Sequence, residues 1–435
     1  MPDSLLPPVA VADMIQFHVL TAFPPHNVNR DEDGRPKTCQ LGGVTRGRIS
    51  SQAKKRALRL APHFPTAQRA TRTRKAGIHT FLKLTAAGID TTSAVWAALA
   101  VNHATGGGGK PPKAEDAQAI AAPDPKKQED AYKKKEKAVT DMMEKRGLDR
   151  AAAEQEWLTG QVGTEQGLVI STREFARIEE GIAHLTAAWA ADRDGFPAVL
   201  EGWVRQVCKE SLLTKADHDL DTALFGRMVA ANANFNVEAA CAVGHAFTTH
   251  RFALEGDYFS AGEELKVLGG TGAVITGYAF FGGGVYYQHA VLDRGHLRTT
   301  LSRGRSAEEA ERLTVQAVDT FLTGLLFSQP RGKCNSHASD VAASYVLATR
   351  GGDPALNLGL AFLDPVKATE DVTDLMCASI RRLTDFHRAL TAAYGLGNAV
   401  CVLNAYPPAR GNDAPRAPEV WTVEDFRRFV QGRGA

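Results

Sequence analysis

Residues 46–61, RGRISSQAKKRALRLA, carry six cationic side chains and no acidic residue, and we expect this segment to organise the fold. Ser50 is a suitable N-cap, because its hydroxyl can accept a hydrogen bond from a free backbone N–H of the first turn. The Ala, Leu, Lys and Arg residues that follow favour a helix, which should begin at Ser51. A dense cationic helix of this kind suits a polyanionic partner.

The predicted helix has two different faces at about 100° per residue. The polar and cationic face carries Gln52, Lys55, Arg56 and Arg59. Small and apolar residues occupy much of the remaining surface and are expected to pack: Ala53, Ala57, Leu60 and Ala61. A helix N-terminus presents unpaired N–H groups and a partial positive charge, so Ser50 lies where a phosphate can be bound. Arg46 and Arg48 lead into that corner.

Charge is unevenly distributed along the chain. Between Arg30 and Lys75 there are 13 Lys or Arg residues and three acidic residues, a local balance of +10, whereas the whole chain has 51 basic and 49 acidic residues. The rest of the chain therefore has a net charge of −8. A basic amphipathic helix alone is commonly a solvated face, but charge segregated in this way is typical of nucleic-acid binding.

Length and composition indicate a globular protein. With 435 residues, of which 44% are hydrophobic, the chain can bury a large core in two or three structural units. The N-terminal segment lacks a basic region followed by a cleavage signal, and no apolar run reaches the roughly 18 residues of a membrane span. The six cysteines include no CxxC pair, which is typical of free thiols. We therefore expect a cytoplasmic protein that does not contact a membrane.

The region before the basic helix is predicted to be a strand followed by a loop. Residues 14–23, MIQFHVLTAF, mix β-branched and aromatic residues with polar ones and end at two prolines, as a strand does. Residues 26–47 favour irregular backbone that exposes N–H groups.

Residues 64–219 are Ala-rich with helical spacing and contain few candidate strands, which indicates an inserted helical domain. Near residues 105–137 this domain is rich in Gly, Pro and Lys and poor in large apolar residues. We expect a flexible connection and a solvated helix there. Because acidic residues nearly balance the lysines, this insertion is not predicted to be the primary nucleic-acid site.

After Asp221 the pattern returns to short strands. ALFGRMVA at 223–230 and FTTHRF at 247–252 are predicted strands, with an Ala-rich helix near 237–246 between them. Residues 251–272 contain too many Gly and acidic residues for a core strand and should project from the body.

The C-terminal part alternates helices and strands. Helices are predicted at 306–326, at 368–393 and after Thr422, with strands at VAASYVLAT and AVCVLNA. The whole order is strand, basic helix, helical insertion, strand, strand, helix, strand. This interrupted βαββαβ order predicts an α+β protein of ferredoxin-like or RRM-like connectivity.

Six segments in chain order resemble the CasC family: NRDEDGRPK, RGRISSQAKKRALR, DTALFGRM, HAFTTH, GGGVYYQHA and GKCNSHASD. The resemblance covers residues 14–429, and its most specific parts are RISSQAKKRA and DTALFGRM followed closely by HAFTTH. That family supplies the repeated CRISPR-RNA-binding backbone subunit of the type I-E Cascade complex. The resemblance implies a non-catalytic protein whose copies stack along a guide RNA beside other Cascade subunits, while the guide pairs with a target DNA strand.

The resemblance also implies a hand-shaped molecule. An RRM-like palm would comprise residues 1–63 and 220–435, helical fingers would comprise 64–219, and a β-hairpin thumb would span 250–284. The insertion near 105–137 departs from the family's usual fingers. The sheet strands lack the RNP aromatic signature of ordinary RRMs, so base stacking on the sheet face is not expected.

A protein that carries any guide sequence must bind phosphates and sugars and leave base edges free, which calls for Arg, Lys, Ser, Gln and backbone N–H groups. The resemblance implies RNA-backbone contacts of this kind from Arg30, Ser50, Gln52, Lys55, Arg56 and Arg59. The other predicted RNA contacts are Asn29, Lys37, Arg46, Arg48 and Lys333. The resemblance implies that Met228 is an apolar wedge beside a base and that Tyr258 and Phe259 lie on the thumb. Residue type alone favours an ordinary core methionine at position 228.

Two other functions remain open. The acidic and His residues of ADHDLD could hold a divalent metal in an RNA-cleaving enzyme, although such residues more often form turns and caps. They are Asp217, His218, Asp219 and Asp221. Cys334 and His337 could begin a zinc site, but no second ligand pair has matching spacing. We therefore predict no catalytic residue, metal or cofactor. The remaining alternative is a general RNA chaperone, which would need no ordered self-assembly.

Overall fold

The computed structural model describes residues 13–107, 110–262, 273–367, 374–406, 419–420 and 422–432. The chain divides into two compact units. The first, the sheet unit, comprises residues 1–65, 240–302 and 306–435, and the second, the helical unit, comprises residues 66–239 and 303–305. The helical unit thus continues beyond residue 219, where sequence analysis ended it, because the segment around Arg227 is bonded to Glu174 inside this unit.

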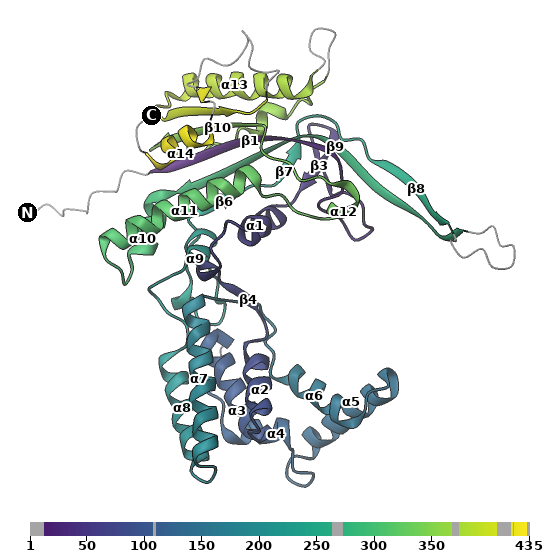
Figure 1. Ribbon diagram of the computed structural model, residues 1–435, viewed down its shortest axis with the longest axis vertical. Coiled ribbons are helices and arrows are strands. Elements are labelled where there is room, and N and C mark those ends of the chain that lie inside the picture. Colours follow the sequence, from purple (N-terminus) through teal and green to yellow (C-terminus); the bar gives the residue numbers. More distant parts are fainter. Residues whose placement is uncertain are drawn as a thin grey trace, which may run out of the picture. The chain divides into compact units, whose positions relative to one another are not determined.

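The sheet unit is built on one mixed sheet (Figure 1). Its strands lie in the order β12 (Glu419–Val420), β11 (Ala399–Asn404), β10 (Tyr345–Gly351), β1 (Met14–His26), β9 (Ala273–Asp293), β7 (Ala246–Thr248), β3 (Val44–Ile49) and β2 (Thr38–Leu41). β6 (Cys241–Val243) and β8 (Glu255–Gly262) also pair with β9. The predicted first strand is confirmed and extends to His26. It runs antiparallel to both β9 and β10.

Helices cover both faces of this sheet, which explains why β1 is buried almost throughout. On one face lie α1 (Ser51–Leu60), α10 (Arg294–Ser302) and α11 (Ala307–Phe327), and the rings of Phe17 and Phe321 are 6.1 Å apart. On the other lie α13 (Leu375–Tyr394) and the 3-10 helix η4 (Leu358–Phe362), as Figure 1 shows for α13. The core on that side includes Tyr287, Tyr345 and Leu383.

Four strands and two helices of this unit follow one another in the order β1, α1, β6, β9, α11, β10. In space the strands lie in the order β10, β1, β9, β6, and each neighbouring pair is antiparallel. The predicted mixture of helices with a largely antiparallel sheet is therefore confirmed. A short helix, α12 (Cys334–His337), connects α11 to β10, and α14 (Val423–Gln431) follows β12.

Two predicted elements were wrong in type. Residues near 237–246 form β6 and β7, not a helix, because they pair with β9; the Gly244 N–H between them donates to the carbonyl of His289 at 2.8 Å. The segment predicted as the strand ALFGRMVA begins instead with helix α9 (Leu220–Phe225), which Asp219 caps. The helix predicted from residue 368 is described only from Leu375, and residues 368–373 lie outside the described part of the chain.

The helical unit contains α2 (Ala76–Ala86), α3 (Thr91–Asn102), α4 (Ala114–Ala121), α5 (Glu129–Arg146), α6 (Arg150–Gln161), α7 (Thr172–Ala191), α8 (Phe196–Glu210) and α9. A two-stranded sheet, β4 (Thr71–Thr73) with β5 (Leu168–Ile170), joins them. Small residues allow the helices to approach closely: a Cβ at Gly181 of α7 would lie 2.7 Å from the ring of Trp203 on α8.

The Lys-rich insertion forms α5, which has a single buried residue, Val139, and is the solvated helix that its composition predicted. Ion pairs within α5 and between α5 and α6 use part of its charge, including Arg146 with Glu156 and Arg150 with Glu136. In the described part of the chain, no helix is long and apolar enough to cross a membrane.

Candidate nucleic-acid interface

The start of α1 is built as its sequence predicted. The Ser50 hydroxyl accepts a hydrogen bond from the Ala53 N–H at 3.2 Å, and the helix begins at Ser51. The side chain of Asn29 accepts from the Ser50 N–H at 2.8 Å, which ties the preceding loop to the helix. Ser50 itself is buried, so its hydroxyl positions the helix and is not presented at the surface.

The helix is rotated relative to the predicted faces. Gln52 and Arg56 are exposed and Lys55 is half-buried, in agreement with the prediction. Arg59, however, is buried, and Leu60 is 45% exposed. The face that packs carries Leu58, which meets α11 so closely that a Cβ on Gly324 would lie 2.3 Å from its Cδ2. This contact turns Arg59 away from the candidate surface and corrects its predicted role.

One cation on the inner side of α1 was not singled out by sequence analysis. Lys54 is buried, and its Nζ donates to the side-chain oxygen of Gln329 at 2.6 Å. Burial lowers the pKa of Lys54 to about 7, because no charge of opposite sign compensates for the lost solvation. Lys54 and Lys55 are thus adjacent in sequence but differ in burial.

Arg46 is the clearest correction among the predicted contacts. Its side chain is completely buried, and its guanidinium donates to the carbonyls of Thr248 at 3.0 Å, Phe362 at 2.8 Å and Leu41 at 3.2 Å. These bonds join β3, β7 and η4. Arg46 therefore holds the sheet together and does not contribute a free cation. Arg48, two residues later on β3, is partly exposed and donates to the Thr38 carbonyl.

The loop before β2 presents the other predicted contacts of the N-terminal region. Arg30 is exposed and forms an isolated β-bridge with Pro36, while Lys37 is half-buried. The backbone N–H of Lys37 donates to the Asn29 carbonyl at 2.9 Å, and its carbonyl accepts from the Arg48 N–H at 2.7 Å. The loop is therefore an ordered extension of the sheet that carries cations toward the start of α1.

A hairpin formed by β8 and the first residues of β9 extends from the sheet unit (Figure 1). Every residue of β8 is exposed, and Tyr258 and Phe259 are 58% and 45% exposed. Phe259 covers Gly277 on the opposite strand, where a Cβ would lie 2.7 Å from its ring. Part of the segment predicted to project, residues 263–272, lies outside the described residues.

At the base of this hairpin a pocket of about 640 Å³ brings together predicted contacts from distant parts of the chain. Arg30, Phe259 and Lys333 all line it, and Lys333 comes from the GKCNSH segment. Tyr278, which sequence analysis missed, lines it as well and is 71% exposed. Its ring lies 5.2 Å from that of Tyr258, directly across the strand pair. The sequence did contain a signal for Tyr278. In YAFF, residues 278–281, side chains alternate between the two faces of a strand, and pairing with DYF, residues 257–259, places Tyr278 opposite Tyr258.

The pocket also contains two carboxylates, Asp33 and Asp257, and further aromatic rings. The guanidinium of Arg35 lies 5.0 Å from the centre of the Phe280 ring, and the ring centres of Phe281 and His337 are 6.1 Å apart. The Asn27 side chain donates to the carbonyl of Phe280 at 2.7 Å and to that of Gly34 at 2.9 Å, which joins the hairpin to the N-terminal loop. Cations and aromatic rings in one open pocket are suited to phosphates and unstacked bases.

Met228, in the helical unit, is 76% exposed. Its neighbours Arg227 and Val229 are buried, so the backbone alternates and directs residue 228 outward. This exposure excludes the alternative of an ordinary core methionine. The surrounding turn is closed by a bridge between Arg227 and Val237, whose backbones exchange two hydrogen bonds of 2.9 Å.

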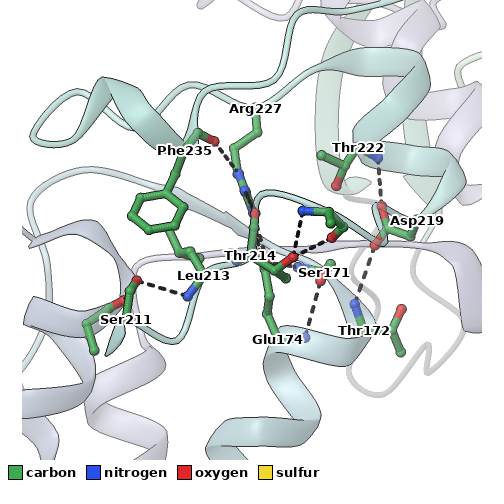
Figure 2. A network of polar contacts seen from close by, with 12 residues as sticks. Ser171, Thr172, Glu174, Ser211, Leu213, Thr214, Asp219, Thr222, Arg227 and Phe235 are labelled. Carbon is green, nitrogen blue, oxygen red and sulfur yellow. Dashed lines mark hydrogen bonds and ion pairs between the residues drawn. The ribbon is translucent and has the colours of Figure 1, made fainter. Parts of the chain in front are cut away.

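Figure 2 shows the polar network that supports this turn. The Arg227 guanidinium, completely buried, donates to both carboxylate oxygens of Glu174 at 2.6 and 2.9 Å. It also donates to the carbonyls of Thr214 and Phe235. Glu174 in turn accepts from the backbone N–H groups of Ser171 and Thr214. The network therefore joins the N-terminus of α7 to Arg227, beside Met228, and to the segments at Thr214 and Phe235.

The acidic cluster that could have indicated catalysis forms caps and ion pairs. Asp219 accepts from the Thr222 N–H at 2.7 Å as the N-cap of α9, and burial raises its pKa to about 6. His218 is buried, which lowers its pKa to about 4. Asp217 pairs with Arg173 at 2.6 Å. Among the described residues, no group of three or more His, Cys, Asp or Glu side chains could hold a metal ion, Cys334 and His337 included.

The sheet face beneath α13 is not an aromatic platform. Tyr287 and Tyr345, which point to that side, are completely buried in the core with Leu383. The Tyr287 hydroxyl donates to the side chain of Asn357 at 3.1 Å. Base stacking on this face is therefore blocked by the chain itself, consistent with the missing RNP signature.

The sequence model of one family, described as CT1975-like protein and denoted Cas_CT1975, matches residues 15–417. A chain of a solved "CRISPR RNA-guided surveillance complex, pre-nicking" has the same fold, with a TM-score of 0.69 and 19% sequence identity over 97% of this chain and 100% of that one. A chain of another "CRISPR RNA-guided surveillance complex" has a TM-score of 0.53 and 15% identity over 96% of this chain and 98% of that one. No curated protein sequence matches significantly.

Proposed function

Because the chain belongs to the CT1975-like family of CasC-like CRISPR proteins, we propose that it is the repeated backbone subunit of a type I-E Cascade complex. Several copies would assemble along one CRISPR RNA in the cytoplasm, together with the other Cascade subunits. Each copy would hold the guide by its phosphates and leave base edges free to pair with a target DNA strand.

The observation that carries this proposal is the convergence of Arg30, Phe259 and Lys333 on one pocket. These residues are distant in sequence; Arg30 and Lys333 were predicted RNA contacts, and Phe259 was predicted to lie on the thumb. Cations beside exposed aromatic rings can bind a backbone and separate two bases without selecting a sequence, since every base offers a π-face. Exposed Gln52 and Arg56, with Lys55, would continue the phosphate-binding surface along α1.

The strand order β10, β1, β9, β6 supports an RRM-like palm, because it is the antiparallel order of a ferredoxin-like βαββαβ unit. In this assignment the sheet unit is the palm and the helical unit provides the fingers. The hairpin of residues 250–284 is the thumb, which reaches a neighbouring copy. Met228 is a second apolar wedge, presented by the helical unit.

We assign the protein no catalytic role of its own. The acidic cluster at residues 217–221 is explained by helix capping and ion pairing, and these uses occupy Asp217 and Asp219. An RNA-cleaving enzyme would require labelled RNA to be cut in Mg²⁺ or Mn²⁺ in a manner abolished by Asp221→Ala. We expect no such cleavage.

RNA that copurifies with the protein tests the proposal most directly. A backbone subunit should retain one RNA species of defined length when it is produced together with a CRISPR array and the other subunits. A general RNA chaperone would retain RNA of mixed lengths. Recovery of mixed RNA under these conditions, with no discrete species, would reject the proposal.

A further inference from the structure

His245 opens the HAFTTH segment, and none of the roles assigned above uses it. It is an exposed residue between β6 and β7, at the start of α1. Its ring nitrogen Nδ1 lies 3.0 Å from the backbone N–H of Ser51 and 3.3 Å from Nη1 of Arg48. Both of these groups are donors. Nδ1 must therefore carry a lone pair, and the proton of the neutral ring must be on Nε2.

The surroundings favour this neutral form. Burial lowers the pKa of His245, and the charges of Arg48 and Lys37 lower it further. Protonation would also place an N–H opposite the N–H of Ser51, at the positive end of a helix. At neutral pH the ring is consequently a hydrogen-bond donor through Nε2, and no described residue accepts from that nitrogen.

The backbone on both sides of His245 is fixed, and the ring is held through Nδ1. The Gly244 N–H donates to the His289 carbonyl at 2.8 Å, and the Gly244 carbonyl accepts from the Gln288 side chain at 3.1 Å. On the other side, Ala246 pairs with Ile49. Because Nδ1 is bound to the helix start, Nε2 lies on the other edge of the ring. A fixed donor thus stands beside the Arg48 and Lys37 cations.

We propose that His245 is a further RNA-contact residue, whose Nε2–H donates to a non-bridging phosphate oxygen of the guide at the start of α1. This inference rests on the proposed function. A neutral donor suits the position, because a third cation would be repelled by Arg48, Lys37 and the helix end. The backbone N–H of Ser51 is occupied by Nδ1, so the histidine replaces that group as the donor that the phosphate meets.

Two substitutions of His245 test the roles of Nδ1 and Nε2 separately. His245→Asn keeps an acceptor at the δ position for Ser51 but has no group at the ε position, whereas His245→Gln places an amide donor near the ε position. Removing one hydrogen bond to a charged phosphate should weaken RNA binding about tenfold in His245→Asn. The melting temperature and the salt dependence should not change, because no cation is lost. His245→Gln should recover part of the affinity.

Arg48→Gln provides the matched control, since it removes a charge from the same corner and should lower the salt slope by about 0.7. If wild-type protein binds RNA and Arg48→Gln weakens it, but His245→Asn binds like wild type, the His245 assignment alone is overturned. If wild-type protein does not bind RNA, the proposed function and this inference both fail.

Two further measurements address the chemistry. Imidazole ¹⁵N spectra of the free protein, assigned by the signals missing in His245→Asn, should show the Nε2–H tautomer at pH 7; an Nδ1–H tautomer or an imidazolium would overturn the inference. Single-stranded DNA of the same sequence should show the same loss in His245→Asn. A loss seen with RNA alone would instead indicate a 2′-hydroxyl and reject the phosphate contact.

Discussion

The start of α1 and the turn that carries Met228 present different chemistry to solvent, and they are stabilised in opposite ways. Around α1 the fixing bonds are made by neutral groups: Ser50, Asn29, His245 and the carbonyls that receive Arg46. Around Met228 the central bond is the buried ion pair of Arg227 with Glu174.

This difference determines what each region can bind. Among the described residues the fixing bonds around α1 use no carboxylate, so the positive charge of Arg48, Lys55 and Arg56 remains available to an anion. In the Met228 turn, charge is neutralised inside the helical unit, and an apolar side chain is presented instead. The first region is suited to phosphates, and the second to the faces of bases.

The largest expected effect comes from breaking the ion pair of the Met228 turn. Glu174→Gln would leave the guanidinium of Arg227 buried without an opposite charge, which should lower the free energy of unfolding by about 3–5 kcal/mol. Chemical denaturation measures this loss. Glu201→Gln removes a carboxylate from the exposed pair with Arg205 in the same unit and should cost less than about 1 kcal/mol. Equal effects in the two variants would contradict the comparison.

The adjacent lysines of α1 give the next effect. Lys54 has a pKa of about 7 in the folded protein, whereas lysine in an unfolded chain titrates near 10.4. Between these values the unfolded chain binds the extra proton, so the free energy of unfolding should rise with pH from about 7, by at most about 1.4 kcal/mol per pH unit. Below pH 7 the free energy of unfolding should no longer change with pH through Lys54, because its amine is protonated in both the folded and the unfolded chain.

Lys54→Met should flatten that rise when unfolding is measured from pH 7 to pH 9, since it replaces the buried amine with an apolar group of similar length. Lys55→Met, at the half-buried neighbouring position, is the matched control for the loss of one charge from the helix. A Lys54→Met profile with the wild-type slope would show that Lys54 is not the group responsible.

These lysines also show how far the sequence could be read. Capping chemistry and helix propensity are local, so the start of α1 at Ser51 was predicted correctly. The rotation of the helix was not, because it depends on the close approach of Leu58 to Gly324, more than 250 residues away in sequence. A pattern of charged residues alone cannot distinguish Lys54, which packs inward, from Lys55.

The same limit applies to the other candidate residues. Arg46 and Arg48 were equivalent in sequence, and only the folded chain shows that Arg46 is the buried one, because it reaches the carbonyls of Thr248 and Phe362. The exposure of Met228 depends on Arg227 reaching Glu174, a partner far away in the chain. By contrast, Arg30, Phe259 and Lys333 line one pocket, a proximity that no local pattern in the sequence indicated; only the resemblance had assigned Phe259 to the thumb.

A smaller effect, on binding and not on folding, is expected from the exposed face of α1. Replacing Lys55 and Arg56 with Ala should weaken binding similarly for all RNA sequences and lower the salt slope by about 0.7 per lost phosphate contact. Fluorescence anisotropy at several salt concentrations measures both quantities. Ala at Lys134 and Lys137, two exposed lysines of α5, removes the same charge and should leave the slope unchanged. Equal slopes for wild type and the α1 variant would remove this helix from the interface.

Met228→Ala should have the smallest effect on stability, because the side chain is mostly in solvent: less than about 0.5 kcal/mol in the free energy of unfolding. Its effect should instead be seen in the bound RNA. An apolar wedge separates neighbouring bases, so a fluorescent base analogue moved along the guide should brighten at regularly spaced, unstacked positions with wild-type protein. In Met228→Ala part of this periodic brightening should be lost, whereas Met228→Leu, which keeps an apolar side chain of similar size, should preserve it. Since the Arg227 and Glu174 network is intact in both variants, a difference between them reports the side chain and not the turn. If both variants keep the wild-type pattern, Met228 is an exposed methionine with no part in base separation. The two regions would then still differ in charge, but only the region around α1 would bind RNA.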